Sequence, residues 1–400
     1  MKNVVIVDAV RLAIGKLGGT LINEQADYLA AAVLEALIER TGISKDSVDE
    51  IILGQAKQSA DLSNVARVAS LRANFPHHIP SYTVHRQCGS GLQAFNNAVQ
   101  QIQAGYGDIL IAGGTESMST APYYVNGMRF GVGAGNVQFK DPNVASQAGS
   151  QPYDQYGDIT MGWTAENLAE KYSISREQQD IFAFTSQQKA ANAIENGYFK
   201  EQIIPYTVKM RKSQTVFEQD EHPRLSEIVA LAKLKAVFKE GGTVTAGNAS
   251  GRNDGAAAVL VMSEEKALAH GLTPLVRVIA QSASGCDPVL MGLGPVLATR
   301  KALAQANLTV EDLDIIELNE AFAAQSLACI QELGLDIEKV NPNGGAIALG
   351  HPIGATGAIL MTKLVHELKR TNKRYGLVTL CIAGGLGIST IVENMEFINS

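Results

Sequence analysis

Two short segments, far apart in the chain, each carry one reactive side chain in a glycine-rich turn ahead of a helical pattern. The first segment is residues 84–91 (VHRQCGSG), which contain Cys88. The second is residues 344–352 (GGAIALGHP), which contain His351. A thiol at a helix start can ionise because the helix N-terminus favours an anion, and an imidazole can accept its proton. The two turns therefore predict an enzyme with a cysteine nucleophile.

Each of these residues also has a structural interpretation. A cysteine is more often a small, inert, buried side chain, but the polar Arg86 and Gln87 and the Gly-Ser-Gly turn favour a functional Cys88. A single histidine is usually structural. Glycines flank His351 and Pro352 fixes its turn, so we interpret His351 as a general base acting on Cys88.

Cys381 and Asn319 are two further candidates. Cys381 ends an apolar strand pattern before Gly384 and Gly385, and by itself it fits a core residue as well as an acid or base. Asn319 follows another predicted strand. Its amide can hold a water or an oxyanion, or it can cap a helix, and these roles are compatible.

An internal repeat indicates how these residues meet. Residues 42–54 resemble residues 307–319, and each segment reads as a turn, a short acidic helix and a strand. The matching flanking elements are helices at 29–40 and 299–306, helices at 92–104 and 358–368, and strands at 109–114 and 377–385. This common order predicts two similar α/β halves. If they pack with pseudo-two-fold symmetry, Cys88 and His351 face each other across the seam.

The segment between the halves differs from both of them. It is polar, has little periodicity until a helical pattern at 176–196, and is long enough to have a function of its own. A strand pattern at 243–262 then returns to the first half. We expect three parts, which are an N-terminal half (1–119 plus 248–272), an inserted loop domain (120–247) and a C-terminal half (273–400).

Composition excludes several classes of protein. The 400 residues are 46% hydrophobic and include 38 glycines, which suits a layered α/β fold. A net charge of −7 without a basic run argues against a nucleic-acid partner. The four cysteines form no CxxC, so we expect no metal and no disulfide framework. Without a signal peptide or membrane-spanning pattern, the sequence predicts a cytoplasmic protein with no membrane partner.

The motifs together resemble those of the thiolase family over the whole chain. They are RQCGSG at 86–91, GNASG at 247–251, NEAF at 319–322, GHP at 350–352, and Cys381 with its glycine-rich tail. The resemblance implies two βαβαβαββ halves in a layered α-β-α-β-α arrangement, plus an inserted loop domain that binds CoA. It also implies a homodimer or homotetramer, and no cofactor beyond the CoA thioesters that serve as substrates.

The resemblance further implies a role for each site residue. Cys88 is acylated by an acyl-CoA while His351 takes its proton, and Cys381 then deprotonates acetyl-CoA. His351 and a water on Asn319 stabilise the enolate, while the backbone N–H groups of Cys88 and Ala383 form a second oxyanion hole. The implied CoA-binding residues are Met161, Arg224, Phe238, Ala246, Ser250, Met291 and Phe322.

Three residues depart from the family pattern, namely Ala383 in place of Gly, His85 in place of Asn, and Thr160 before Met161 in place of His. An alanine at 383 costs energy if that position needs a positive φ. Gly15-Lys16 and residues 243–255 most resemble acetyl-CoA acetyltransferases, which condense two acetyl-CoA to acetoacetyl-CoA and CoA. The alternatives are a degradative 3-ketoacyl-CoA thiolase of broader chain length, a decarboxylating ketosynthase and a non-catalytic CoA-binding carrier.

Overall fold

The computed structural model describes residues 2–209 and 213–399, and its centre is one mixed β-sheet of ten strands. The first half contributes, in spatial order, β4 (Ser81–Val84), β3 (Glu50–Gly54), β5 (Ile109–Ser117), β8 (Asn253–Ser263) and β1 (Val4–Arg11), with β2 (Gly15–Lys16) on β8. The second half contributes β10 (Ile315–Leu318), β11 (Tyr375–Ile382), β12 (Leu386–Asn394) and β9 (Val276–Gly285). A short antiparallel pairing of β1 with β9 joins the halves.

The two halves repeat one strand order. In the first half β3 lies parallel between β4 and β5, and β8 returns antiparallel to β5. In the second half β10 lies parallel to β11, and β12 returns antiparallel to β11. The second half has a single parallel bridge between Ile316 of β10 and Val340, which corresponds to the pairing of β3 with β4 in the first half. The predicted repeat is therefore confirmed.

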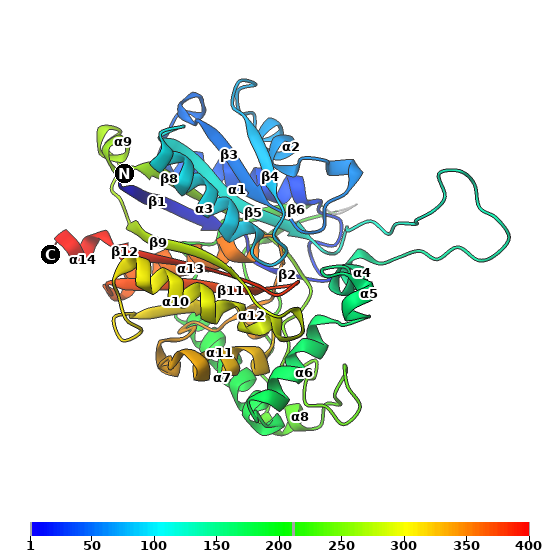
Figure 1. Cartoon of the computed structure of the whole chain (residues 1–400). Coiled ribbons are helices and arrows are strands. Elements are labelled where there is room, and N and C mark those ends of the chain that lie inside the picture. The colour runs from blue at the N-terminus through cyan, green and yellow to red at the C-terminus, as the bar shows by residue number, and fades with distance from the viewer. Residues whose placement is uncertain (1, 210–212, 400) are drawn as a thin grey trace.

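Helices form three layers around these strands (Figure 1). The outer layer on the first half contains α1 (Ala26–Thr41) and α2 (Val65–Arg72), and the outer layer on the second half contains α10 (Gly294–Ala306) and α11 (Ala323–Leu333). The central layer consists of α3 (Ser90–Ala104) and α13 (Thr356–Thr371), which pack on each other and on strands of both halves. The order of layers is the predicted α-β-α-β-α.

The central helices touch without side chains between them at their first turns. A methyl group on Gly357 of α13 would come within 2.3 Å of the Leu92 backbone nitrogen in α3. A methyl group on Gly91 of α3 would come within 2.9 Å of the Ala358 nitrogen in α13. Only hydrogen fits at these two positions, so the glycines set how closely the turns of Cys88 and His351 approach each other.

The inserted segment between β5 and β8 forms the lower lobe and a long arm in Figure 1. Its described elements are α4 (Pro142–Ala148), α5 (Tyr153–Tyr156), α6 (Met161–Lys171), α7 (Arg176–Glu195), the hairpin of β6 (Tyr206–Lys209) and β7 (Gln214–Phe217), and α8 (Ile228–Ala232). The helix expected at 176–196 is confirmed as α7, with Asn196 as its C-cap. Helix α6 has no counterpart among the predicted elements, and the Thr160 hydroxyl caps it by accepting from the Trp163 N–H.

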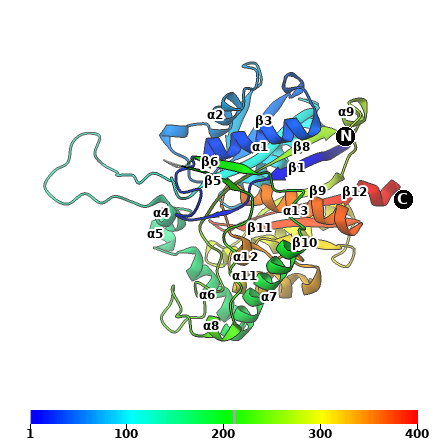
Figure 2. The same cartoon turned by 180° about the vertical axis from the view of Figure 1, so that it is seen from behind.

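A buried ion pair ties the insertion to the first half. Arg11 at the end of β1 binds both carboxylate oxygens of Asp220, at 2.7 and 2.9 Å, and both side chains are 0% exposed. Asp220 also accepts from the Ile14 N–H, and Arg11 donates to Gln202. Figure 2 shows β6 lying beside α1 on this side of the molecule.

The remaining elements complete the chain and include one difference from expectation. They are the helices α9 (Glu264–Ala269), α12 (Ala346–Leu349) and α14 (Met395–Asn399) and the 3₁₀ turns at 45–47, 60–62, 288–293 and 337–339. The acidic segment at 309–312 is a turn and not the expected helix, because Asp312 accepts from the N–H and hydroxyl of Thr309. Within residues 2–209 and 213–399, no helix combines the length and apolarity needed to cross a membrane.

We predict that Gly357→Ala lowers both stability and activity. The new methyl group meets backbone of α3, so α3 and α13 must separate, and overpacking of this kind costs about 1–3 kcal/mol. Urea denaturation and the acyl-transfer rate measure the two effects. Gly133→Ala is the control, since a Cβ there meets open space and the free energy of unfolding should change by less than about 0.5 kcal/mol. Equal behaviour of the two variants would contradict the role of the helix contact.

Candidate active site

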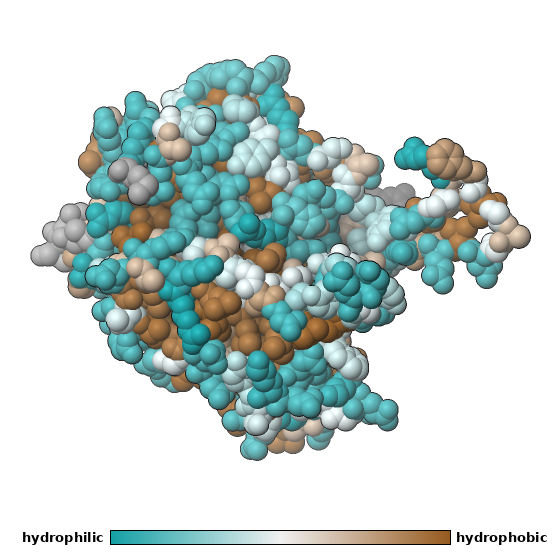
Figure 3. Space-filling view, in the orientation of Figure 1, coloured by the Kyte–Doolittle hydropathy of each residue, from teal (hydrophilic) through white to brown (hydrophobic). Residues whose placement is uncertain are grey.

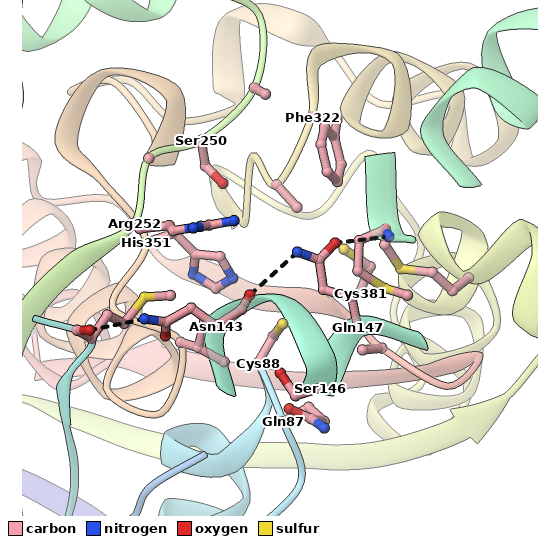
Figure 4. A pocket seen from close by; sticks show the side chains of 18 of the residues that line it. Gln87, Cys88, Asn143, Ser146, Gln147, Ser250, Arg252, Phe322, His351 and Cys381 are labelled. Atoms are coloured by element: carbon pink, nitrogen blue, oxygen red, sulfur yellow. Dashed lines mark hydrogen bonds between the residues drawn. The ribbon is translucent and has the colours of Figure 1, made fainter. Parts of the chain in front are cut away.

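A cavity of about 870 Å³, counting the space open to solvent, lies where the two halves and the insertion meet (Figure 4). It collects residues from β11, α6, the segment after β3 and the turns before α3 and α13. Nine of the twelve site residues predicted from sequence line it, namely Cys88, His351, Cys381, Ala383, Met161, Phe238, Ser250, Met291 and Phe322. The fold therefore brings together most of a site whose members are spread over nearly the whole chain.

The turn before α3 holds Cys88 out into this cavity. Gln87 has a left-handed φ of 44°, a strained conformation for a residue with a side chain. The Ser90 hydroxyl closes the turn, because it accepts from the Arg86 N–H and donates to the Gln87 carbonyl. Gly89 is the N-cap of α3. These local bonds fix the direction of the Cys88 side chain.

The environment of Cys88 opposes the ionisation of the thiol that the helix start favours. Burial raises the pKa of the thiol, and this effect outweighs three that lower it. Those three are the backbone N–H groups of Ala383 and Cys88, which donate towards the sulfur, and the charge of Lys57. The helix position alone predicted the wrong direction, since it leaves out the loss of water around the sulfur.

His351 presents a free acceptor to the cavity. Its Nδ1 lies 2.7 Å from the Thr356 hydroxyl, which donates its one hydrogen to the Pro352 carbonyl at 2.9 Å. The hydroxyl must therefore accept from Nδ1–H, which leaves the lone pair on Nε2. That nitrogen is buried and has no partner among the described residues. Burial, followed by the charge of Lys57, lowers the pKa of His351 to about 4, so the ring is neutral.

Contacts from both halves of the fold set the position of His351. It lies in the loop ahead of α13, which begins at Thr356. Its backbone N–H donates to the Asn253 side chain at 2.9 Å, and Asn253 belongs to β8 of the other half. The imidazole is therefore placed by contacts from both halves, and Figure 4 shows it facing the same space as the Cys88 sulfur.

Cys381 and Ala383 close the far side of the cavity at the end of β11. Cys381 is buried, and burial, together with the charge that Cys88 would carry as a thiolate, raises its pKa well above the usual value. All four cysteines are free thiols. Ala383 is not among the non-glycine residues with left-handed backbone, so its methyl group causes no strain of the kind expected from the sequence.

Asn319 lies at the end of β10 but outside the lining of this cavity. It is 0% exposed, and neither its Nδ2 nor its Oδ1 has a partner within the described residues. The interpretation of Asn319 as a helix cap is wrong, because the N-cap of α11 is Phe322. A buried amide with both groups free is unusual and is suited to hold a small polar ligand.

Arg224 and Ala246 are the two predicted CoA contacts that the cavity lining does not include. They contact each other, since the exposed Arg224 guanidinium donates to the Ala246 carbonyl at 3.1 Å. Metal binding has no visible basis in the described residues, where no three His, Cys, Asp or Glu side chains group around one point. The expected absence of a metal stays a prediction.

The polar wall of the cavity was not predicted from the sequence. Its members outside the predicted motifs include Lys57, Asn143, Ser146, Gln147 and Arg252. One signal was available for Lys57, since the repeat aligns Gly54 with Asn319 and so places Lys57 where Phe322 stands in the other half. Arg252 directly follows the GNASG motif. The residues from α4 carry no comparable signal.

Comparisons with known proteins identify the family of this chain. The family description "Thiolase, N-terminal domain" matches residues 4–265, and "Thiolase, C-terminal domain" matches residues 272–394. An acetyl-CoA acetyltransferase of Pseudomonas aeruginosa is 49% identical over 391 residues, covering 97% of this chain and 98% of that protein. The crystal structure of the Bacillus anthracis acetyl-CoA acetyltransferase is similar with a TM-score of 0.96, 47% identity and 99% coverage of both chains. Human mitochondrial 3-ketoacyl-CoA thiolase in complex with CoA is similar with a TM-score of 0.93, 41% identity and 98% coverage of both chains.

We predict that alkylation of Cys88 by iodoacetamide accelerates steadily with pH. Because its pKa is raised, the thiol is protonated at pH 7, and the thiolate fraction grows about tenfold per pH unit up to at least pH 9. Peptide mapping by mass spectrometry gives the rate at Cys88, with Cys286 as the internal reference. In His351→Gln the shape of the profile should persist. A plateau between pH 5 and 8 that this variant abolishes would instead reveal a thiolate–imidazolium pair.

Proposed function

The chain belongs to the thiolase family, and we propose that the cavity around Cys88 is its active site. The protein is an acyltransferase that catalyses the reversible Claisen condensation of two acetyl-CoA molecules to acetoacetyl-CoA and CoA. One observation carries the site assignment. Cys88, His351 and Cys381 come from three separate parts of the sequence and line one cavity.

In the first half-reaction the Cys88 sulfur attacks the thioester carbonyl of an acyl-CoA. The bond from sulfur to the acyl carbon forms, and the bond from that carbon to the CoA sulfur breaks. The Nε2 of His351 accepts the thiol proton and returns it to the departing CoA, a role that its neutral ring and free lone pair support. The N–H groups of Cys88 and Ala383 stabilise the oxyanion, and their approach to the sulfur supports that placement.

In the second half-reaction Cys381 first loses its own proton to solvent, and the resulting thiolate removes a proton from the methyl group of acetyl-CoA. The carbanion attacks the acyl carbon, and Cys88 departs as a thiolate that takes a proton from solvent. In the cleavage direction Cys381 gives its proton to the leaving carbanion. The raised pKa of Cys381 keeps it protonated and so suits that direction. His351 stabilises the enolate oxygen together with a water on the free amide of Asn319.

CoA thioesters are the substrates, and we assign the apolar wall of the cavity to the pantetheine arm of CoA. Met161, Phe238, Met291 and Phe322 pack together there, with the rings of Phe238 and Phe322 in edge contact at 6.0 Å. Ser250, Arg224 and Ala246 complete the proposed CoA contacts. The first of these lines the cavity, and the other two bind each other outside it.

We also propose a domain division, a cellular compartment and an oligomeric state for the protein. We assign residues 1–119 plus 248–272 and residues 273–400 to the two halves, residues 120–247 to a CoA-binding loop domain, and the protein to the cytoplasm. We also propose a homodimer or homotetramer. The arm at 120–139 stands clear of the body (Figures 1 and 3) and exposes 97% of Phe130 and 74% of Phe139. A second copy of this chain would cover these apolar side chains.

A degradative 3-ketoacyl-CoA thiolase of broader chain length is the second candidate. It is supported by the likeness to the human mitochondrial 3-ketoacyl-CoA thiolase. We predict that kcat/KM for thiolysis is lower for methyl-ended 3-ketoacyl-CoA substrates of eight or more carbons than for acetoacetyl-CoA. In the proposed acetyl-CoA acetyltransferase, Cys88 carries an acetyl group and not a longer acyl chain. A strong preference for the longer chains would establish the second candidate.

Substitution of the two cysteines separates the two half-reactions. Cys88→Ser should form no acyl-enzyme, since a serine hydroxyl is a far weaker acid and nucleophile than a thiol. Cys381→Ala should still become acylated and exchange labelled CoA into acetyl-CoA, but condensation should fall by at least about 100-fold, as for loss of a general base. Intact-protein mass spectrometry detects the acyl group. Normal acylation of Cys88→Ser would refute the nucleophile assignment, and normal condensation by Cys381→Ala would refute the base.

A further inference from the structure

Two cationic side chains line the cavity that holds Cys88, and no carboxylate among the described residues lines it with them. The cations are Lys57 and Arg252. The proposed reaction of acetyl groups uses neither of them, because an acetyl group carries no charge. Their presence at the reacting sulfur therefore calls for a separate explanation.

Lys57 is buried without an ionic partner. It is 6% exposed, and its ammonium group donates to the Ser146 hydroxyl of α4. The nearby carboxylate of Glu116 accepts instead from the backbone N–H groups of Ala56, Lys57 and Gly354, at 2.8–3.0 Å. No ion pair of Lys57 is found within the described residues. Lysine is rarely buried unless it is paired, and the Lys57 ammonium has the Ser146 hydroxyl as its hydrogen-bond acceptor among the described residues, so it keeps donors for an anion.

Arg252 adds a second charge from the neighbouring wall. Its backbone forms a bridge with His351, and Figure 4 shows its side chain extending over the cavity above that residue. Its guanidinium has neither a hydrogen bond nor an ion pair to any described residue, although such a group offers five donors. Burial lowers the pKa of Lys57, the charges of Glu116, Cys88 and Asp141 oppose that effect, and the charge of Arg252 adds to it. An anion bound between the two groups would offset both the burial of the Lys57 charge and its repulsion by Arg252.

The place of Lys57 indicates which part of a substrate meets it. Figure 4 shows Ser250 and Phe322 on one side of the cavity, and Ser146 and Gln87 on the other side with Cys88. The apolar wall around Phe322 suits the pantetheine arm, whereas Lys57 belongs to the wall of Ser146, to which it is bonded. An acyl group on Cys88 that points away from the pantetheine arm therefore extends towards Lys57.

We propose that this active site takes, besides acetyl groups, acyl groups that end in a carboxylate, which Lys57 binds with the support of Arg252. The inference rests on the proposed function and specifies its substrate class. The preferred substrates for cleavage are 3-oxoacyl-CoA thioesters with a carboxylate at the far end of the chain. Attack by Cys88 on C3 breaks the C2–C3 bond, releases acetyl-CoA and leaves the carboxylate-bearing acyl group on the sulfur until CoA removes it.

The test compares two six-carbon substrates that differ only at the far end. They are 3-oxoadipyl-CoA, with a carboxylate, and 3-oxohexanoyl-CoA, with a methyl group. We expect the wild-type protein to have a kcat/KM at least about tenfold higher for the carboxylate substrate. Lys57→Met should lower the ratio of the two values by about 10- to 100-fold, as for loss of a hydrogen bond to a charged group. Arg252→Leu, at an exposed position, should lower the ratio several-fold.

Controls distinguish this role from two others. If Lys57 acts only on the Cys88 thiol, or if the two cations bind CoA phosphates, kcat/KM falls equally for both substrates and the ratio stays constant, which would overturn the proposal. A wild-type ratio near one would also overturn it, whether or not the variants fold. Lys301→Met, exposed on α10, should leave the ratio unchanged. Failure of the wild-type protein to cleave even acetoacetyl-CoA would instead refute the proposed function.

Discussion

The contact between the first turns of α3 and α13 is the constraint on which the site depends. Glycine hydrogens at 91 and 357 let the two backbones meet with no side chain between them. Cys88 precedes one helix and His351 precedes the other, so the approach of the backbones sets the approach of the reacting groups. Further hydrogen bonds between the halves, such as that from the His351 N–H to the Asn253 side chain, hold the two turns in fixed positions relative to each other.

Burial then decides the charge state of the reacting groups. It raises the pKa values of Cys88 and Cys381 and lowers that of His351, so the resting site holds two thiols and a neutral imidazole. Such a site works by moving protons during the reaction and not by maintaining an ion pair. The N–H groups of Cys88 and Ala383 favour negative charge only where it develops, which is a property of preorganised sites.

The inserted segment provides what the two halves lack. The halves present the reacting side chains, whereas α4, α6 and the loop through Phe238 supply much of the cavity wall. The buried pair of Arg11 and Asp220 fixes part of that segment to β1, and removal of either partner would leave an uncompensated charge in the interior. The polar wall made with α4 also contains Ser146, whose hydroxyl accepts the hydrogen bond from the Lys57 ammonium.

The sequence by itself determined the repeated α/β halves, the turns of Cys88 and His351, and the place of Cys381 at a strand end. These follow from local patterns, because glycine positions and apolar periodicity act within a few residues. Only the tertiary structure decided the protonation of Cys88, the exclusion of Arg224 and Ala246 from the cavity, and the arrival of Lys57 and Arg252 in it. Those outcomes depend on desolvation and on neighbouring side chains from several distant segments. A local sequence pattern does not show which distant segments will become neighbours.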